Sequence, residues 1–356
     1  MTLQYLNSRE EELIKRHTDF WNHNLSKPVI NYFSLWKRIN NLINLSENVL
    51  HPDWVRLGEG AEITSEMLVP ATHHYYHEFE EFGDSRICGE VFNTIIPWTM
   101  ITWLPAIAGC RLKISVKGRT VWPEEYIESK WYERQDLGLA PNWQWLDKLK
   151  EFTAFLAGKY NPGRQVSLEM FSRGPGDMLV NCLGTENTYF AMYDRPEELK
   201  KLLSILADIH IKWSSEQLKL IPGLKGGYCN QWGIWAPGKV TRIQEDYAVN
   251  ISEKLFREFL EPADAKIIEA SPYQVFHTHS GFPDLSKWVL ELEGLKAVEV
   301  TMDLISPSLE ELLPVWKKIL ARKSLIVTGT FTEDQIKMIV SKLDSSGLFL
   351  DVDILA

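Results

Sequence analysis

The sequence predicts an α/β protein built as one parallel barrel with an N-terminal helical elaboration. In its second half, short β-branched runs alternate strictly with amphipathic stretches, a pattern typical of parallel strands joined by helical crossovers. The chain has 356 residues, and one α/β barrel reaches that size. We find no repeat, low-complexity tract or Pro/Gly/Ser linker between the halves. We therefore predict a single domain over 1–356.

The second half supplies the clearest elements. Strands are predicted over 166–171, 227–229, 273–277, 297–300 and 324–327. Helices are predicted over 196–219, 253–260, 284–292, 309–320 and 333–343. The first helix carries an inward face at spacings of three and four, made of Leu199, Leu202, Leu203, Leu206, His210 and Trp213. Three helix starts carry capping signals, namely Asp194 with Pro196, Ser306 with Pro307, and Thr330 with Glu333.

The first 165 residues are less regular. Residues 1–60 are predicted to be a helical extension, with a short helix starting near Ser8 and Glu11. A second helix is expected over 65–82, and 111–121 indicates strand and turn. The stretch 91–110 has no charge and is long enough to span a bilayer, but its two prolines favour a buried or pocket-lining segment.

Composition excludes several classes of function. A net charge of -10 with scattered Lys and Arg leaves no basic surface for nucleic acid. The four cysteines, Cys88, Cys110, Cys182 and Cys229, form no CxxC pair, so we interpret them as reduced, mostly buried thiols of a cytoplasmic protein. The N-terminus has no apolar run of a signal peptide. No membrane is expected as a partner, and a homodimer stays open.

The pair His277 and His279 is the strongest candidate for chemistry. In a parallel barrel the active site lies at the carboxyl ends of the strands, and this pair stands where a strand runs into a glycine turn. Residues at i and i+2 of a strand point the same way, so the two imidazoles share a face. A catalytic zinc takes about three protein ligands and an open position. Metal binding and a hydrogen-bonded structural role both stay open at this stage.

Other polar residues follow the predicted strands. Arg173 and Asp177, in a Gly-Pro-Gly loop, are candidates for binding an anionic group of the substrate. Asp246 and Asp303 are each either pocket carboxylates or solvated acids. A rival metal set, His73, His74 and His77 with Glu78, has helical spacing but is more typical of a solvated helix face.

The chain has fourteen tryptophans, and aromatic residues gather in several loop-like or apolar stretches. Most tryptophan is core, but a rim of aromatic rings also suits an aromatic or quaternary ammonium ligand. We expect three of these side chains to bind substrate, namely Tyr228, Trp232 and Trp235, while Trp98 and Trp103 lie in the uncharged stretch.

From 226 to 303 the order of motifs resembles the uroporphyrinogen decarboxylase superfamily, which also holds zinc-dependent, corrinoid-linked methyltransferases. The motifs are Gly-Gly, Gln-Trp-Gly, Ala-Pro-Gly, Gln-Glu-Asp246, Ile-Ser252, Phe256-Arg-Glu-Phe259, Pro262, His277-x-His279-x-Gly281 and Val300-x-x-Asp303. The likeness extends over about 165–350, through Asp194-Arg-Pro196-Glu197-Glu198-Leu199 and Thr328-Gly329-Thr330. The resemblance implies a (β/α)8 TIM barrel.

The chain departs from the superfamily in two ways. The arginine-rich N-terminal string that grips tetrapyrrole carboxylates is missing before residue 60, which disfavours tetrapyrrole decarboxylation. The methyltransferase branch holds zinc by a His-x-Cys pair and a later Cys, and His279 stands where the first Cys is expected. No cysteine follows Cys229, so a carboxylate, Glu299 or Asp303, is expected as third ligand. We predict His277, His279 and Glu299 as the zinc site.

The resemblance implies a methyltransferase that demethylates a small apolar or aromatic donor and passes the methyl group to a corrinoid. A nitrogen and oxygen ligand set makes zinc a stronger Lewis acid, suited to a leaving heteroatom, with Asp246 or Asp303 assisting proton transfer. No cobalamin-binding Asp-x-His-x-x-Gly string occurs, so the corrinoid is expected on a partner protein. Two alternatives stay open: a metal-free decarboxylase or lyase that uses Arg173 and the aspartates, and a non-catalytic barrel that binds a small molecule.

Overall fold

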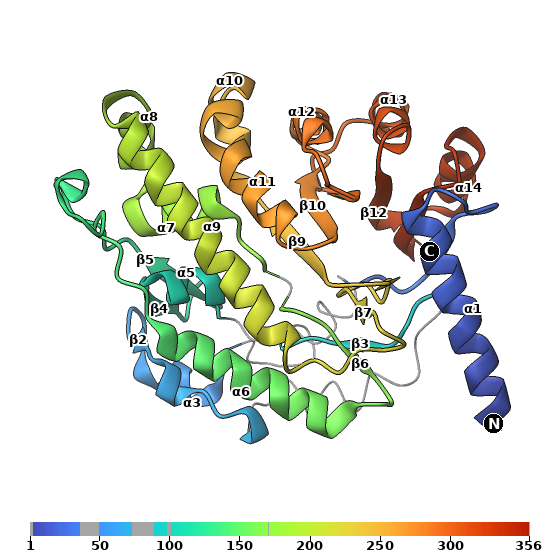
Figure 1. The fold of residues 1–356 in the computed structure, drawn as a ribbon, viewed down its shortest axis with the longest axis horizontal. Coiled ribbons are helices and arrows are strands. Elements are labelled where there is room, and N and C mark those ends of the chain that lie inside the picture. The colour runs from blue at the N-terminus through green and yellow to red at the C-terminus, as the bar shows by residue number, and fades with distance from the viewer. Residues whose placement is uncertain (1–2, 36–49, 73–88, 98–100, 170, 356) are drawn as a thin grey trace.

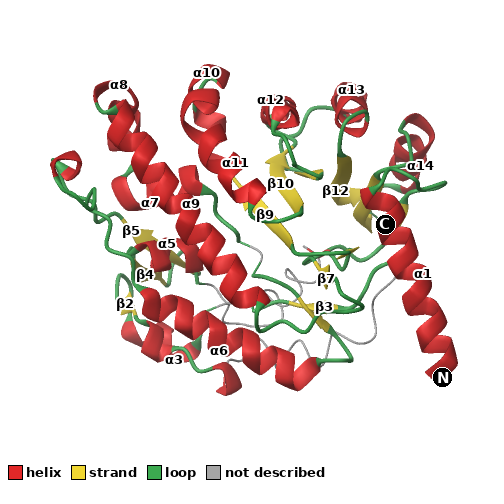
Figure 2. Cartoon of the chain, in the orientation of Figure 1, coloured by secondary structure: helices red, strands yellow, loops and turns green. Residues whose placement is uncertain are grey.

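The centre of the molecule is a six-stranded, wholly parallel sheet (Figure 1). The computed structural model describes residues 3–35, 50–72, 89–97, 101–169 and 171–355. The strand order is β1-β13-β12-β11-β10-β9. The strands are β1 (Val29–Asn31), β9 (Val240–Gln244), β10 (Tyr273–His279), β11 (Ala297–Thr301), β12 (Ser324–Phe331) and β13 (Leu348–Ile354). Helices flank these strands on the outside (Figure 2).

The apolar sequence of these strands explains why both faces of the sheet are covered. Parallel strands that are buried on both faces have near-continuous runs of Val, Ile and Leu. Fully buried side chains occupy consecutive positions in 325–327 and 348–350, and Val275 and Phe276 do the same in β10. The apolar side chains of the sheet therefore form the core, while buried polar side chains such as Arg242, Glu299 and Asp351 stand within the strands.

Shorter strands complete the sheet structure. β3 (Thr94–Ile95) and β6 (Gln165–Val166) pair in parallel, and an isolated parallel bridge joins Arg173 to Gln244 beside β9. β2 (Glu62–Ile63), β4 (Arg111–Ser115) and β5 (Thr120–Glu124) form an antiparallel sheet. No sheet among the described residues closes on itself, so the predicted closed barrel is not observed there. The predicted strand 166–171 pairs with β3 at Val166, and its described residues after Val166 have no strand structure.

One predicted strand has a different partner. The segment 227–229 pairs antiparallel, as β7 (Tyr228–Cys229), with β8 (Trp235–Ala236), because the chain turns back at Gly233, where φ is +83°. A side chain at that glycine would also collide with the backbone of Phe92. The parallel strand of this region is β9 instead. The predicted strands 273–277, 297–300 and 324–327 are confirmed, and each is longer than expected.

The helices confirm most of the predicted rhythm. The α-helices are α1 (Leu3–Trp21), α3 (Pro52–Leu57), α5 (Trp103–Ala108), α6 (Trp143–Tyr160), α7 (Pro175–Leu183), α8 (Thr185–Asp194), α9 (Pro196–Leu218), α10 (Glu253–Leu255), α11 (Glu261–Glu269), α12 (Pro283–Trp288), α13 (Leu309–Leu320) and α14 (Glu333–Lys342). The π-helical turn η5 (Phe256–Leu260) joins α10 to α11. Short 3-10 turns are η1 (Ser65–Met67), η2 (Pro70–Thr72), η3 (Trp131–Glu133), η4 (Asp246–Asn250) and η6 (Val289–Glu291).

The capping predictions were wrong by one or two residues. Arg195, not Asp194, precedes α9. The capping boxes of α13 and α14 are Ser308 with Glu311 and Thr332 with Gln335. In place of capping, Ser306 donates to the carbonyl of Asp303, and Thr330 remains in β12. The predicted inward face of α9 is confirmed, because all its members are buried.

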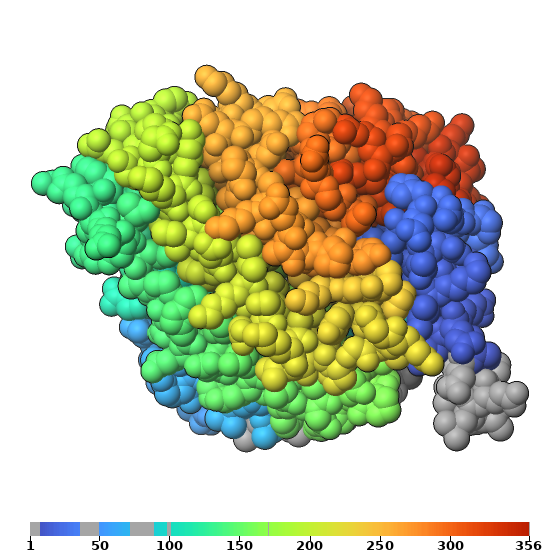
Figure 3. All heavy atoms as spheres, in the orientation of Figure 1, coloured from blue at the N-terminus to red at the C-terminus, as the bar shows by residue number. Residues whose placement is uncertain are grey.

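The N-terminal part differs from its prediction in length and type. The helix expected near Ser8 is the 19-residue α1, which lies beside the C-terminal elements (Figure 3). The expected helix 65–82 is two 3-10 turns over 65–72, and 73–82 lies outside the described residues. The strand and turn expected over 111–121 are confirmed and belong to the β4–β5 hairpin, and the apolar segment 103–108 is fully buried. Within the described ranges, no helix has the length and apolar character that crossing a membrane requires.

Candidate metal centre

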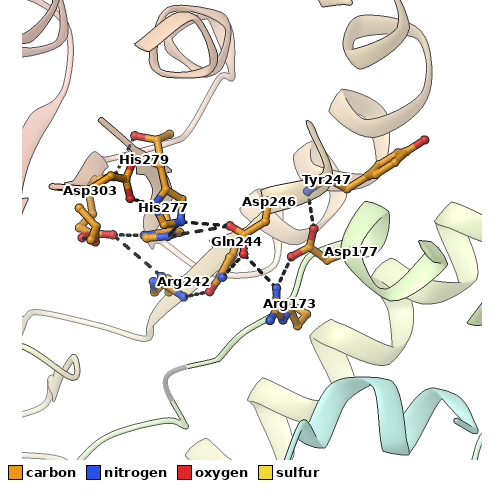
Figure 4. A network of polar contacts seen from close by, with 12 residues as sticks. Arg173, Asp177, Arg242, Gln244, Asp246, Tyr247, His277, His279 and Asp303 are labelled. Atoms are coloured by element: carbon orange, nitrogen blue, oxygen red, sulfur yellow. Dashed lines mark hydrogen bonds and ion pairs between the residues drawn. The ribbon is translucent and has the colours of Figure 1, made fainter. Parts of the chain in front are cut away.

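Asp246, His277 and His279 converge at the carboxyl end of the central sheet (Figure 4). Register brings them together: His277 lies opposite Gln244 of β9, so Asp246, two residues further on, comes level with His279. The two Nε2 atoms of the histidines are 3.0 Å apart. Asp246 Oδ1 is 3.5 Å from Nε2 of His279 and 4.0 Å from Nε2 of His277. Three potential metal-binding atoms thus face one small volume.

A carboxylate holds the far side of each imidazole. Nδ1 of His277 hydrogen-bonds to Glu299, and Nδ1 of His279 lies 2.7 Å from Oδ1 of Asp303. An N–H at each Nδ1 leaves a lone pair at each Nε2, and both lone pairs point at the same volume. Carboxylates that fix the tautomer and orientation of histidines in this way are typical of metal sites.

The donor set fits zinc. Two Nε2 lone pairs 3.0 Å apart repel each other unless a proton or a cation lies between them. Two imidazoles that bind one Zn²⁺ at about 2.0–2.1 Å each bring their nitrogens to roughly 3 Å of each other. Two nitrogens and one carboxylate oxygen are a common ligand set for catalytic zinc. These residues therefore suit one Zn²⁺.

The carboxylate of Asp246 is oriented from its other oxygen. Oδ2 accepts hydrogen bonds from Arg173 Nη1 at 3.0 Å and Gln244 Nε2 at 2.6 Å, which leaves Oδ1 facing the histidines. Burial works to raise the pKa of Asp246. The hydrogen bond with His279 and the charge of Arg173 outweigh burial and hold that pKa below its ordinary value. Asp246 is therefore ionised, as a metal ligand must be.

The predicted anion-binding pair supports this carboxylate. Arg173 Nη1 also donates to Asp177 Oδ2 at 2.9 Å, and Asp177 Oδ1 accepts from the backbone N–H of Tyr247 at 2.8 Å. Burial and the charge of Asp246 raise the pKa of Asp177 to about 6. Because one guanidinium nitrogen already serves two aspartates, the structure places Arg173 and Asp177 behind Asp246 as part of its support.

Glu299 and Asp303 lie at positions in the site that differ from those predicted from the sequence. Glu299, predicted as the third ligand, lies on β11 at the Nδ1 side of His277, and Thr301 donates to its Oε1 at 2.6 Å. Asp303, expected to assist proton transfer, accepts from the N–H of Gly281 at 2.8 Å and holds His279. Asp246 occupies the position expected for Glu299, because it faces the Nε2 side of both rings.

The expected aromatic substrate site is not beside the metal centre. Tyr228, Trp232 and Trp235 belong to the β7–β8 hairpin, which enters β9 at its amino end, whereas Asp246 follows its carboxyl end. Five residues of β9 span about 16 Å at roughly 3.3 Å each. The backbone carbonyl of Trp235 accepts a hydrogen bond from Nε1 of Trp21. Nε1 of Trp235 donates a hydrogen bond to the backbone carbonyl of Leu224. These tryptophans are core.

The other aromatic and histidine candidates are placed as follows. Trp103 is buried against Trp145 in the N-terminal half. Trp98 and the rival metal set of His73, His74, His77 and Glu78 lie outside the described residues.

Sequence reasoning missed three residues of the site. Gln244 bonds to Asp246, and Arg242 donates to Gln244 Oε1 at 2.7 Å and lies 3.9 Å from Glu299. Their spacing at i and i+2 of a strand was the available signal, since both face the side of the sheet that holds His277. Glu245 accepts from the N–H groups of 176 and 177 at the start of α7. Gly174 and Gly176 permit this approach, because a Cβ at either would lie under 3 Å from that carboxylate.

The site is open on one side. The side chains of His277 and Glu299 are 2% and 1% exposed, whereas those of His279 and Asp246 are 35% and 37% exposed. The buried pair anchors the centre in the sheet, and the partly exposed pair is accessible to solvent. A catalytic zinc needs such an open position.

Comparisons with known proteins show the fold. No protein-family model matches the chain, and no curated protein sequence matches it. Among solved structures, the chain is similar to a methyltransferase from Methanosarcina mazei, with a TM-score of 0.61 and 14% identity over 96% of this chain and 93% of that chain. This structural similarity shows a shared mixed α/β architecture around a parallel sheet. At 14% identity, the similarity shows the fold alone. The resemblance to the uroporphyrinogen decarboxylase superfamily stays an expectation.

Proposed function

We propose that the protein is a zinc-dependent methyltransferase that demethylates a heteroatom of a small organic substrate. The observation that carries this proposal is the convergence of the Nε2 atoms of His277 and His279 with Oδ1 of Asp246 on an open side of the sheet. The likeness in fold to a methyltransferase supports the reaction class. Because a fold alone does not imply a function, the proposal depends mainly on the residues of the site.

In this proposal, three residues bind the metal and two others orient the metal-binding histidines. Asp246, His277 and His279 hold the metal, and Glu299 and Asp303 fix the two imidazoles. Zinc held by these nitrogen and oxygen donors would supply Lewis acidity toward the heteroatom of the substrate. The absence of a thiolate from the described ligand set favours this role over activation of a thiol acceptor.

We propose a corrinoid on a partner protein as the methyl acceptor. This part of the proposal rests on the motif order from 226 to 303 and on the lack of a cobalamin-binding string in the sequence. The metal-free decarboxylase has less support from the geometry. Its expected carboxylate-binding group, Arg173, already pairs with Asp177 and Asp246.

Metal analysis and a transfer assay test the proposal together. We expect purified protein to bind about one zinc per chain and His277→Ala, His279→Ala and Asp246→Ala each to bind almost none. His51→Ala, at a half-buried histidine that caps α3, is the matched control and should keep its zinc. With a reduced corrinoid protein and candidate methyl ethers, methylamines or methyl sulfides, the wild type should produce the methylcobalamin spectrum and the three variants should not.

The two measurements can fail separately. Purified protein without zinc, and with transfer activity unchanged in His277→Ala, would contradict the metal centre. Stoichiometric zinc without transfer to any corrinoid from this panel of methyl donors would leave the metal centre standing and contradict the methyltransferase assignment.

A further inference from the structure

A pair of cysteines lies outside the group formed by Asp246, His277 and His279. Cys110 follows α5 and precedes β4, and Cys182 lies in the last turn of α7. Their Sγ atoms are 3.5 Å apart, although the residues are 72 positions apart in the sequence. Both thiols are buried, and both are free. Sulfur atoms at this separation are in direct contact.

We propose that Cys110 and Cys182 are an oxidation site at which a peroxide forms an intramolecular disulfide. In the first step one sulfur attacks a peroxide oxygen and becomes a sulfenic acid, and one water is released. In the second step the other sulfur displaces the sulfenic hydroxyl as a second water. Hydrogen peroxide is thus reduced to two waters, and the two thiols lose two electrons and two protons. The proposal does not depend on the proposed methyltransferase function.

Contact between the sulfurs favours the second step. A disulfide has an S–S length of about 2.0 Å, so the two side chains need to close by only about 1.5 Å. A sulfenic acid formed at either cysteine has the other sulfur beside it, and further oxidation has to compete with that immediate partner. The adjacent sulfur therefore directs the reaction to the disulfide.

The first step is slow. The hydrogen bond with Cys182 and burial hold the pKa of the Cys110 thiol well above its usual value. The thiolate is the form that attacks peroxides, and buried cysteines react slowly. We therefore expect conversion in hours under millimolar peroxide. The reduced protein remains the resting form.

The crosslink would tie three parts of the N-terminal half together. It joins the start of β4 to the end of α7. The carbonyl of Cys182 also accepts hydrogen bonds from the N–H groups of Tyr126 and Ile127, the second and third residues after β5. A disulfide that closes a long span of sequence restricts the unfolded chain, so the oxidised protein should unfold at a higher temperature.

Peptide mapping of the wild-type chain tests the proposal without a variant. Full-length protein is treated with hydrogen peroxide, alkylated in denaturant and digested. We expect a crosslinked peptide that contains Cys110 and Cys182, and an intact mass lower by about 2 Da from the two lost hydrogens. A sulfinic acid at either residue, a crosslink to Cys88 or Cys229, or no crosslink after hours would overturn the proposal.

Variants add an independent control. Cys229→Ser removes a buried thiol that has no cysteine partner among the described residues, and it should still form the crosslink and show the rise in unfolding temperature. Cys110→Ser and Cys182→Ser should lose both effects. Zinc content should stay the same in the oxidised wild type, because neither sulfur belongs to the Asp246, His277 and His279 group.

Discussion

His277 and His279 lie two residues apart on β10 but occupy very different surroundings. Burial and the neighbouring Arg242 guanidinium lower the pKa of His277, which keeps this imidazole neutral and ready to bind a metal. The hydrogen bond with Asp246 raises the pKa of His279 to about 9. In the metal-free protein a proton on His279 therefore relieves the repulsion between the two Nε2 atoms. Metal binding has to displace that proton.

The carboxylates behind the two imidazoles are expected to control metal affinity. Glu299→Gln and Asp303→Asn should each weaken zinc binding by about 10- to 100-fold, since the histidines lose the partner that fixes their tautomer and orientation. A competition titration with a chelating indicator measures this change. Glu291→Gln, which disturbs an exposed pair with Arg322, is the control. Zinc affinity equal to wild type in both variants would contradict the supporting role of these carboxylates.

Arg173 provides a sharper test of the site, because two roles were open for it. If it orients Asp246, Arg173→Gln should weaken zinc binding about 10-fold and leave the KM of an uncharged substrate little changed. If it binds a substrate carboxylate, zinc affinity should stay at the wild-type value and KM should rise. Arg257→Gln, which breaks pairs with Glu253 and Glu261 on the surface, controls for the loss of charge.

At the scale of elements, the sequence predicted the type of a helix or strand better than its start or its partner. The 309–320 helix was predicted with the bounds that it has, because its apolar spacing is local information. Its cap was not, because both Ser306 and Ser308 can accept an N-terminal N–H. The choice depends on Ser306 bonding to Asp303, a residue outside the helix. β13 was missed because Asp351 and Asp353 interrupt its apolar run.

The capping box of α13 is expected to contribute measurably to stability. Ser308→Ala removes the hydroxyl that accepts from the N–H of Glu311, and we expect the free energy of unfolding to fall by about 1 kcal/mol. Urea unfolding followed by circular dichroism measures this change. Ser215→Ala in α9, whose hydroxyl only donates to a carbonyl of its own helix, should change stability by less than about 0.5 kcal/mol.

At the scale of the whole molecule, α1 is held to the body by a buried histidine. Nδ1 of His17 accepts from the N–H of Trp235 at 3.0 Å, and Nε2 donates to the carbonyl of Glu90 at 2.8 Å. Both ring nitrogens are used, so the imidazole is neutral. Burial lowers the pKa of His17 from 6.5 to about 4. Between pH 6.5 and about pH 4, His17 is therefore protonated in the unfolded chain and neutral in the folded chain.

This difference makes stability depend on pH. Because the folded pKa lies below the unfolded pKa, stability is complete above about 6.5 and falls as the pH is lowered toward 4. We expect His17 alone to cost about 2 kcal/mol of unfolding free energy between pH 7.5 and pH 5. His17→Gln should lose stability at pH 7.5 and show a pH slope smaller by that amount. An unchanged slope in urea titrations at the two pH values would refute this assignment.

The sequence by itself determined the alternation of helices and strands in the second half and the position of His277 and His279 on one face at a strand end. These features follow from local periodicity, since side chains alternate along a strand and repeat around a helix. Only the tertiary structure decided which carboxylate faces the histidines. His277 lies between Gln244 of β9 and Glu299 of β11, and the register of these strands, not their spacing in sequence, brings Asp246 to the Nε2 atoms.

The arrangement of the strands also explains why the tryptophans of the β7–β8 hairpin lie apart from the metal centre. They precede Asp246 closely in the sequence, but β9 runs between them and carries the chain from one end of the sheet to the other. The prediction of a closed barrel was likewise based on the order of helices and strands along the sequence. Strand pairing is a long-range property, and among the described residues it produces an open six-stranded sheet with Arg173 bridged to its β9 edge.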